Sequence, residues 1–317
     1  MTEFSGVWVP IVTPLRDDRV DRPAVRRLVE RFVQAGCAGI VVGATTGEAS
    51  ALDQDEKAVV LDTVLEAAGG RAPVLMGVSG TDTRTMSAQA RHWARQPVAG
   101  LLVTPPSYVR PSQEGCIRHF ETIGAAADVP MVLYNIGYRT GVALETQTIA
   151  RLARDPRVQA IKECGGDLNR LQELISLGRP TVLCGEDAWA FTALCAGAGG
   201  VIAAAAHVRP DLWVSLANAV RDQRLNQARA LFERLLPVIR LLFAQPNPAP
   251  LKAALAMSGE ITDELRLPML ALAPAEREAL GQALKTLLAS SDPTLPRRDD
   301  SELNETLRCA GARQPVL

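Results

Sequence analysis

The stretch Val158-Gln159-Ala160-Ile161-Lys162-Glu163-Cys164-Gly165-Gly166 is a short apolar run that ends in charges and then in glycines. Such a run is typical of a buried strand in a parallel sheet. Lys162, at the end of this strand, would lose hydration there, and desolvation lowers the pKa of an amine towards its neutral, nucleophilic form. On this stretch alone, a lysine that reaches from the strand end into water is the slightly favoured alternative. The rest of the chain reverses that preference.

The same pattern, a short apolar run followed by a helical stretch, occurs eight times along the chain. The predicted strands are Val7–Thr13, Gly39–Gly43, Val74–Val78, Gly100–Thr104, Met131–Asn135, Val158–Lys162, Thr181–Cys184 and Gly200–Ala204. Helices predicted after them include Arg22–Ala35, Gln54–Ala68, Arg84–Arg95, Gln113–Ala126 and Glu145–Ala153. The second and fourth of these helices follow a capping residue, Asp53 and Ser112, and have an acidic first turn.

Eight consecutive strand–helix units predict the α/β class and a (β/α)₈ TIM barrel. An open, doubly wound sheet is the competing architecture. It is less favoured because eight regular repeats fill the roughly 250 residues that a barrel needs.

The chain continues after the eighth unit with helical stretches that have no strands between them. These stretches are Leu225–Phe243, Pro250–Met257 and Ala275–Leu288. They predict a C-terminal helical extension packed on the barrel. The expected domains are therefore a barrel over residues 1–223, a helical region over 224–291 and a poorly ordered tail over 292–317.

The composition is that of a soluble globular protein, with 47% apolar and 22% charged residues. The net charge of −1 gives no electrostatic reason to expect a nucleic-acid or anionic-membrane partner. No apolar run approaches the ~20 residues that span a bilayer. Residues 1–6 have neither the basic nor the apolar region of a secretory signal.

Cysteine and histidine usage argues against disulfides and metal sites. The six cysteines are Cys37, Cys116, Cys164, Cys184, Cys195 and Cys309. No two of them form a C-x-x-C pair, and most lie in apolar segments, so we expect buried free thiols in a cytoplasmic protein. The three histidines show no metal-ligand spacing, and we expect no metal site.

The carboxyl ends of the strands converge on one mouth of such a barrel. Residues that can react with or bind a substrate should therefore lie at the carboxyl ends of the other strands, as Lys162 does at the end of Val158–Lys162. The segments Gly43–Glu48, Thr104–Tyr108 and Leu133–Asn135 meet this expectation. Barrel closure would bring their side chains together without any proximity in sequence.

The segment Gly43–Glu48 combines the hydroxyls of Thr45 and Thr46 with backbone N–H groups at a strand-to-helix turn. Such a turn can hold a carboxylate, because unpaired amides and a helix N-terminus favour negative charge. By pattern alone, a glycine-bounded turn with capping threonines is the favoured alternative. The segment does not match G-x-G-x-x-G, so a dinucleotide site is not indicated.

Tyr134 ends a predicted strand, where a core aromatic with one satisfied hydroxyl is the ordinary interpretation. The functional alternative is proton transfer to and from a Schiff base. A phenol with a pKa near ~10 needs a relay partner for this, and Thr45 and Tyr108 are candidates. All the tyrosines of the chain, Tyr138 included, fall at predicted loop or strand-end positions, which favours the functional interpretation.

Arg139, in a predicted loop, can bind a substrate carboxylate through its planar guanidinium. A solvated loop arginine is an equally weighted alternative. Glu163, Glu186 and Asp187 also follow strand ends, and we interpret them as structural or supporting acids.

Several motifs together resemble the dihydrodipicolinate synthase branch of the pyruvate-dependent class I aldolases, also called 4-hydroxy-tetrahydrodipicolinate synthases. The motifs are Gly43–Glu48, Val103–Pro105, Arg110–Gly115, Leu133–Asn135, Arg139–Gly141, Ile161–Glu163, Gly200–Ile202, Gln245–Pro248 and Leu265–Pro268. They occur in order and at matching spacing between about Gly6 and Leu288. Each motif is weak alone, but the set is specific.

The resemblance implies a lyase that condenses pyruvate with L-aspartate 4-semialdehyde in lysine and diaminopimelate biosynthesis. It implies a (β/α)₈ barrel with a helical C-terminal region, a cytoplasmic homotetramer built as a dimer of dimers, and no metal or organic cofactor. A sister aldolase acting on another aldehyde or on a 2-keto sugar acid, such as an N-acetylneuraminate lyase, is the alternative. A non-catalytic relative that kept the barrel is a third, and retention of the catalytic set argues against it.

The resemblance also assigns roles to single residues. It implies that Lys162 forms the Schiff base with pyruvate. It implies that Tyr134, Thr45 and Tyr108 relay protons, with Tyr108 reaching in from a neighbouring subunit. The loop that carries Tyr108 is one residue longer than the usual T-P-Y-Y-N-R loop, and we assign the relay tyrosine to Tyr108.

The substrate-binding positions follow in the same way. The resemblance implies that Thr46 and Ile202 hold pyruvate, with Gly47 as a further substrate-binding position. It implies that Arg139 guides the carboxylate of the aldehyde. The motif Arg139-Thr140-Gly141 favours a short carboxylated aldehyde over a polyol.

The residues that bind inhibitory lysine in some relatives are changed in this chain. The altered positions are Gln54, Lys57, Thr81, Thr85 and Ser107. The cationic Lys57 would repel a lysine ligand. The sequence therefore predicts weak or absent inhibition by lysine.

Overall fold

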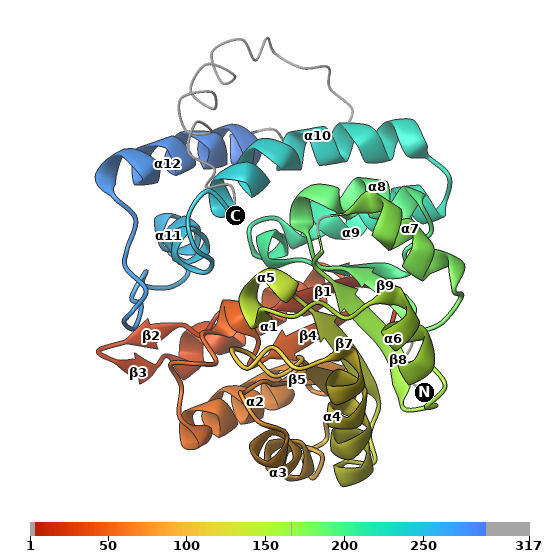
Figure 1. Ribbon diagram of the computed structural model, residues 1–317. Coiled ribbons are helices and arrows are strands. Elements are labelled where there is room, and N and C mark those ends of the chain that lie inside the picture. Colours follow the sequence, from red (N-terminus) through yellow and green to blue (C-terminus); the bar gives the residue numbers. More distant parts are fainter. Residues whose placement is uncertain (1–3, 166, 290–317) are drawn as a thin grey trace.

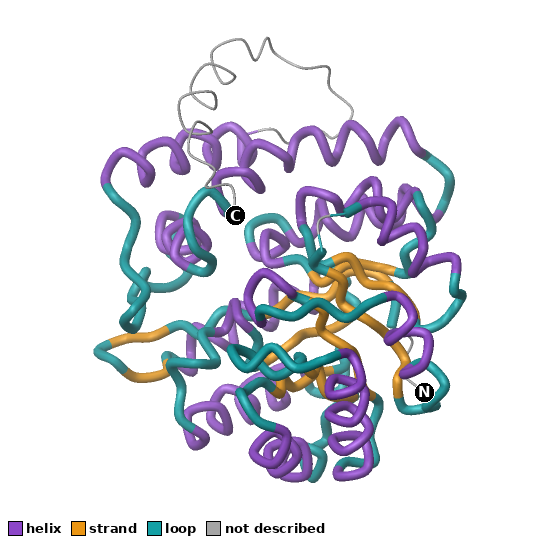
Figure 2. Tube along the Cα trace, in the orientation of Figure 1, coloured by secondary structure: helices purple, strands orange, loops and turns teal. Residues whose placement is uncertain are grey.

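Eight parallel strands close into a barrel in the computed structural model, which describes residues 4–165 and 167–289 (Figure 1). The order around the barrel is β1-β10-β9-β8-β7-β6-β5-β4. The strands are β1 (Gly6–Pro10), β4 (Gly39–Val42), β5 (Val74–Val78), β6 (Gly100–Val103), β7 (Met131–Asn135), β8 (Val158–Glu163), β9 (Thr181–Cys184) and β10 (Gly200–Ile202). Figure 2 shows them grouped inside a ring of helices, which confirms the predicted TIM barrel.

One main helix follows each barrel strand. These helices are α1 (Arg22–Gln34), α2 (Gln54–Ala68), α3 (Thr83–Trp93), α4 (Gln113–Ala126), α6 (Thr146–Leu152), α7 (Leu168–Ser176), α8 (Ala190–Cys195) and α9 (Pro210–Arg221). The predicted start signals are confirmed: Asp53 and Glu56 form a capping box on α2, and the Ser112 hydroxyl accepts from the Gly115 N–H at the start of α4.

The barrel interior and the layer between barrel and helices form separate apolar clusters. Trp8 fills the interior with no exposed surface, and its ring lies where a Cβ on Gly39 would be, at 2.2 Å. Only glycine therefore allows β4 to pass the indole ring. The side chains of Leu102, Val132 and Ala160 also point into this interior cluster.

A bulge in the pairing of β7 with β8 orients the upper half of β8. Met131 pairs with Val158, but Val132 pairs with Ala160, so Gln159 is an extra residue in β8. Beyond the bulge, Tyr134 pairs with Lys162, and both side chains point into the barrel. The bulge thus sets which face of β8 carries the lysine.

The first predicted strand was too long at its end, because the chain leaves the barrel after Pro10. The Val12 N–H donates to Nε2 of His207 and the Thr13 hydroxyl donates to the Gly47 carbonyl, so neither continues the strand ladder. An unpredicted hairpin follows, formed by β2 (Leu15–Arg16) and β3 (Arg19–Val20).

The predicted C-terminal helices are confirmed as α10 (Leu225–Leu242), α11 (Ala249–Met257) and α12 (Pro274–Ala289). In Figure 1, α10 and α12 lie beyond α8 and α9, and α11 lies beside α12. The predicted boundary at residues 223–224 falls between α9 and α10, and the division into domains stays a prediction. The predicted tail, 292–317, lies outside the described residues.

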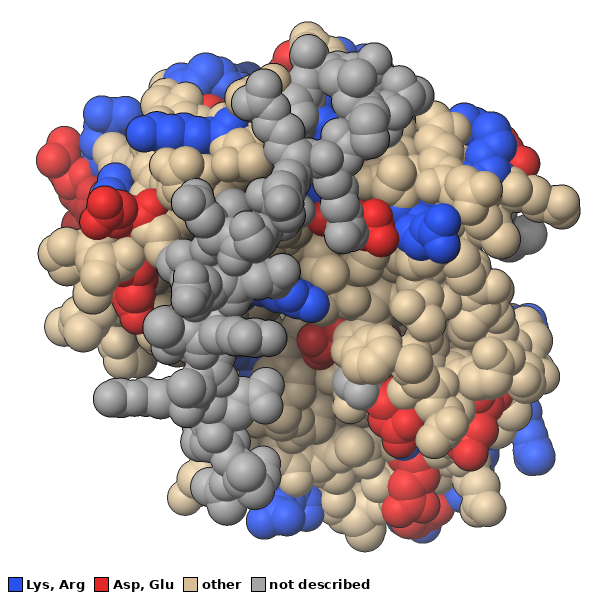
Figure 3. Space-filling view, turned by 90° about the horizontal axis from the view of Figure 1, so that it is seen from above, with Lys and Arg blue, Asp and Glu red and all other residues tan. Residues whose placement is uncertain are grey.

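The surface is mixed in charge. On the part of the face that Figure 3 shows in colour, basic and acidic groups are both present and are separated by uncharged surface. Within the described parts of the chain, no helix is both long enough and apolar enough to cross a bilayer.

Candidate active site

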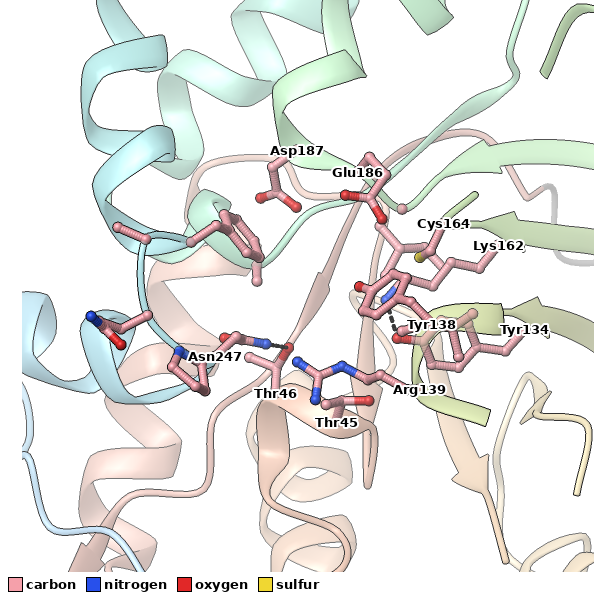
Figure 4. Close-up of a pocket in the computed structure, with 18 residues that line it drawn as sticks. Thr45, Thr46, Tyr134, Tyr138, Arg139, Lys162, Cys164, Glu186, Asp187 and Asn247 are labelled. Atoms are coloured by element: carbon pink, nitrogen blue, oxygen red, sulfur yellow. Dashed lines mark hydrogen bonds between the residues drawn. The ribbon is translucent and has the colours of Figure 1, made fainter. Parts of the chain in front are cut away.

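Lys162 and Tyr134 form a buried pair at the carboxyl end of the barrel (Figure 4). Nζ of Lys162 donates to Oη of Tyr134 at 3.2 Å and lies 4.3 Å from the centroid of the phenol ring. Lys162 is 5% exposed, which contradicts the alternative of a lysine extended into water. An amine and a phenol are therefore held together in the wall of a pocket at the barrel mouth.

The pKa of Lys162 lies above its ordinary value. Burial by itself lowers it, as the sequence predicts, but negative charge on Tyr134 or Cys164 and the hydrogen bond to Tyr134 favour the ammonium form and outweigh burial. The prediction of a lowered pKa was therefore wrong in its net direction. It missed the acidic neighbours, which lie on the adjacent strand and at the end of β8.

The two neighbours are themselves hard to ionise. Burial raises the pKa of Tyr134, against the lowering effect of the Lys162 charge, of the nearby Thr45 side chain and of the hydrogen bond from Lys162. Burial also raises the pKa of the Cys164 thiol well above its usual range. When the pair of Lys162 and Tyr134 has lost one proton, it can be a neutral amine with a neutral phenol or an ammonium with a phenolate. The neutral pair avoids burying two charges. That combination contains the nucleophile.

The predicted turn after β4 begins with Gly43, whose φ of +67° is in the left-handed region. A short 3₁₀ turn over Thr45–Gly47 follows and brings the Thr45 side chain close enough to the Tyr134 hydroxyl to lower the pKa of this phenol. Asn247 donates from Nδ2 to the Thr46 hydroxyl oxygen at 3.0 Å. The Thr46 hydroxyl accepts this bond and donates none to the described residues, so its proton is available to a ligand.

These groups surround a pocket of about 380 Å³ at the barrel mouth. Six predicted site residues line it, namely Lys162, Tyr134, Thr45, Thr46, Arg139 and Ile202. Gly47 does not line it: its N–H donates to the Ala44 carbonyl within the turn. The structure thus brings together six side chains that are up to 157 positions apart, from Thr45 to Ile202 (202 − 45 = 157).

Arg139 was predicted in a loop, but it lies in the one-turn helix α5 (Gly137–Thr140). Gly141, with a φ of +80°, ends this helix, and the Thr140 hydroxyl donates to the Val142 carbonyl. The guanidinium lies 5.7 Å from the centroid of the Tyr138 ring and points across the pocket in Figure 4. A cation is therefore presented to any ligand bound near Lys162.

Tyr108 lies outside the pocket of its own chain. It is 88% exposed, its φ is +73°, and its N–H donates to the Thr140 carbonyl. The phenol is thus displayed on the surface next to helix α5, which carries Arg139. Its own subunit gives it no contact with Lys162.

Sequence reasoning missed two acids of the pocket, Glu186 and Asp187, which were interpreted as structural. Both line the pocket, on the other side from Thr45 and Thr46 (Figure 4). Burial and the neighbouring Asp187 raise the pKa of Glu186 to about 7, and burial raises that of Asp187 to about 6. Their position after the seventh barrel strand was the available signal. Glu163, by contrast, faces away and accepts from Asn135 at 2.8 and 3.0 Å.

The cysteines within residues 4–165 and 167–289 are all free thiols. Four are buried as predicted, but Cys195 is exposed at the end of α8, where that prediction was wrong. Cys309 lies outside the described residues. In the described residues there is also no group of three or more His, Cys, Asp or Glu side chains that could hold a metal ion.

Comparison with known proteins gives one consistent result. Residues 3–287 match the model of the dihydrodipicolinate synthetase family. The 4-hydroxy-tetrahydrodipicolinate synthase of Pelobacter propionicus is 38% identical over 285 residues, which cover 89% of this chain and 98% of the relative.

Solved structures agree with the sequence comparison. The chloride-inhibited dihydrodipicolinate synthase of Acinetobacter baumannii, complexed with pyruvate, superposes with a TM-score of 0.88 at 34% identity, over 90% of this chain and 99% of that one. A monomeric dihydrodipicolinate synthase variant also gives a TM-score of 0.88, at 33% identity, over 90% and 97% of the two chains.

Proposed function

Because the chain belongs to the dihydrodipicolinate synthetase family, we propose that it condenses pyruvate with L-aspartate 4-semialdehyde to give 4-hydroxy-tetrahydrodipicolinate. The protein is a lyase of the aldolase type that serves lysine and diaminopimelate biosynthesis. The hydrogen bond between Lys162 and Tyr134 inside the pocket is the observation that carries this proposal. It couples the amine that must attack a ketone to a group that can move its proton.

The reaction begins when the neutral Lys162 amine attacks the C2 ketone of pyruvate. Loss of water from the carbinolamine gives the Schiff base, and loss of a C3 proton gives an enamine. The enamine carbon attacks the aldehyde of the second substrate and forms the new carbon–carbon bond. The amino group of that substrate then adds to C2 and displaces Lys162, which returns as the free amine.

Each of these steps moves a proton, and Tyr134 is the group placed to move it. Its Oη contacts both Lys162 and Thr45. Thr45 passes the proton on towards Tyr108 of a neighbouring subunit. Because the phenol is buried and its pKa raised, it holds its proton until water or a substrate oxygen accepts it.

The carboxylates of pyruvate and of the aldehyde substrate bind to different residues. The Thr46 hydroxyl donates a hydrogen bond to the carboxylate of pyruvate, and Ile202 packs against the rest of this small molecule. Gly47 contributes as part of the turn that fixes Thr46. Arg139 binds the carboxylate of the aldehyde substrate, a role that a planar guanidinium performs well.

The exposure of Tyr108 supports assembly into a homotetramer, a dimer of dimers. A tyrosine 88% exposed beside a valine 55% exposed, Val109, suits insertion into a second subunit. The name of one relative, a monomeric variant, fits an oligomer as the ordinary state of such proteins. Free thiols support a cytoplasmic location. Weak inhibition by lysine stays a prediction.

The test is an assay of the purified protein with pyruvate and L-aspartate 4-semialdehyde, run beside a panel of other aldehydes and 2-keto sugar acids. We expect product from the named pair and a far lower kcat/KM for the panel. Preferred turnover of a sugar acid would support the sister-aldolase alternative. Absence of turnover with every pair would leave only a binding role.

A further inference from the structure

Lys252, in α11, has no exposed surface, and the proposed reaction does not use it. Its Nζ lies 2.5 Å from Oε1 of Glu48 and 2.7 Å from the carbonyl oxygen of Glu264. Both members of this ion pair are removed from water. Stability alone is a weak reason for such a pair, because apolar side chains of similar volume often stabilise a core as well or better.

Glu48 has an unusual backbone. Its φ of +54° and ψ of +36° are in the left-handed region, which costs energy for any residue with a Cβ. Its N–H donates to the Thr45 carbonyl at 3.0 Å and so closes the turn over Thr45–Gly47. Its second carboxylate oxygen accepts from the Arg266 N–H at 3.3 Å. The residue that closes the turn is thus held from both sides by the C-terminal region.

The same region reaches this turn at a second point. Asn247, two residues before the start of α11, donates to the Thr46 hydroxyl. Thr45, in turn, contacts Tyr134, which contacts Lys162. An unbroken series of contacts therefore runs from α11 through the turn to the reacting pair.

We propose that the buried pair of Glu48 and Lys252 is a positioning device that holds the Thr45 and Thr46 hydroxyls at the geometry catalysis needs. This inference rests on the proposed function, which gives those hydroxyls their roles. It makes the C-terminal helical region part of the active-site framework, and it makes Glu48 and Lys252 positioning residues that touch no substrate. Displacing a positioned group by about 1 Å can cost about a hundredfold in rate.

The test replaces the pair by apolar side chains in the double variant Glu48→Leu/Lys252→Met. We expect a folded protein with a Tm within about 4 °C of the native one. We expect kcat to fall at least about tenfold and KM for pyruvate to rise, because the turn loses its anchor. Borohydride should still trap pyruvate on Lys162, more slowly than in the native protein.

A matched control is the double variant Arg31→Met/Glu260→Leu. This ion pair also joins the C-terminal region to the barrel, but it contacts α1 and not the turn. We expect it to change Tm without changing kcat or KM. Loss of activity in both double variants to the same extent would mean that any loosening of the C-terminal region impairs the enzyme, and would overturn the proposal.

A folded Glu48→Leu/Lys252→Met protein with native kcat and native KM would also overturn it. If that variant does not fold, the isosteric Glu48→Gln replaces it. This change removes the charge that Lys252 binds, and we expect kcat to fall at least about threefold and amide exchange of residues 44–50 to accelerate. Native values for both would contradict the proposal. Borohydride trapping of pyruvate is done first on the native protein. Absence of an adduct on Lys162 there would show that the proposed chemistry fails, separately from the role of the ion pair.

Discussion

At the scale of single residues, the proposed mechanism depends on the hydrogen bond between Tyr134 and Lys162. In Tyr134→Phe, the ring still fills its place in the barrel, but the hydroxyl that accepts from Nζ of Lys162 and lies near Thr45 is removed. We expect kcat to fall about 10²- to 10³-fold, because proton transfer loses its carrier. Steady-state kinetics measure this. Tyr138→Phe, which removes a pocket hydroxyl with no assigned proton to move, is the control and should change kcat far less.

The pKa of Glu186 predicts a pH-dependent effect on stability. Its pKa is about 7 in the folded protein against 4.5 for a free side chain, mainly because of burial. Between those values the folded state binds more protons than the unfolded state, so the contribution of Glu186 to the free energy of unfolding falls as pH rises through this window. Below pH 4.5 the side chain is protonated in both states and this effect disappears.

The variant Glu186→Gln should therefore be more stable than the native protein at pH 8, by roughly 1–3 kcal/mol, and similar to it at pH 4.5. Thermal unfolding of both proteins at the two pH values measures this. A gain of the same size at both pH values would show that the carboxyl of Glu186 titrates near its ordinary value.

Residues that act over long sequence distances show the limit of prediction from sequence. Lys162, Tyr134 and Thr45 were predicted to lie together because each ends or follows an apolar strand, and they do line one pocket. Lys252 gives no such signal, since its partner Glu48 is 204 positions away and its burial depends on how α11 docks. The pKa direction of Lys162 failed because the sequence does not give the distance between its amine and the Tyr134 hydroxyl, and this distance decides whether burial or the neighbouring groups dominate.

At the scale of elements, the sequence predicted helix boundaries best where a capping residue marks the start of the helix. The bounds Gln54–Ala68 and Gln113–Ala126 were predicted as observed, because Asp53 and Ser112 cap these helices. The hairpin of β2 and β3 was missed, since two-residue strands show no alternation. Its turn uses Asp17 and Asp18, both with positive φ, whose N–H groups bind the Glu264 carboxylate across the fold.

The cap of α2 is directly testable. The Asp53 carboxylate accepts from the Glu56 N–H at 2.8 Å, and the Asp53 N–H donates to the Glu56 carboxylate. In Asp53→Ala, both interactions weaken, and we expect the free energy of unfolding to fall by about 1 kcal/mol. Denaturant titration measures it, with Asp53→Ser, which retains a capping oxygen, as the control. An unchanged midpoint in Asp53→Ala would contradict the assigned cap.

At the scale of the whole molecule, a single chain does not complete the proposed proton relay. The pocket holds Lys162, Tyr134 and Thr45, while Tyr108 points away from it on a loop with two left-handed residues, Tyr108 and Arg110. The sequence predicts Tyr108 as a relay residue, and under the proposed mechanism a second subunit must supply its phenol. The oligomer is therefore a functional requirement of the proposed mechanism.

Mixed oligomers test this requirement. Lys162→Ala subunits lack the nucleophile but keep Tyr108, whereas Tyr108→Phe subunits keep the nucleophile and lack the relay phenol. Each variant alone should be nearly inactive. An equal mixture, unfolded and refolded together, should regain about a quarter of the native activity, because half of randomly formed dimers contain one complete site of two. Activity no higher than the average of the separate variants would contradict a shared site.

The most direct measurement is reduction of the protein with borohydride in the presence of labelled pyruvate, followed by mass analysis of its peptides. A reducible Schiff base requires a neutral amine in contact with the ketone of the bound keto acid. The account predicts one label per chain, on Lys162, and none in Lys162→Ala. Label on another lysine, or no label in an active protein, would contradict it.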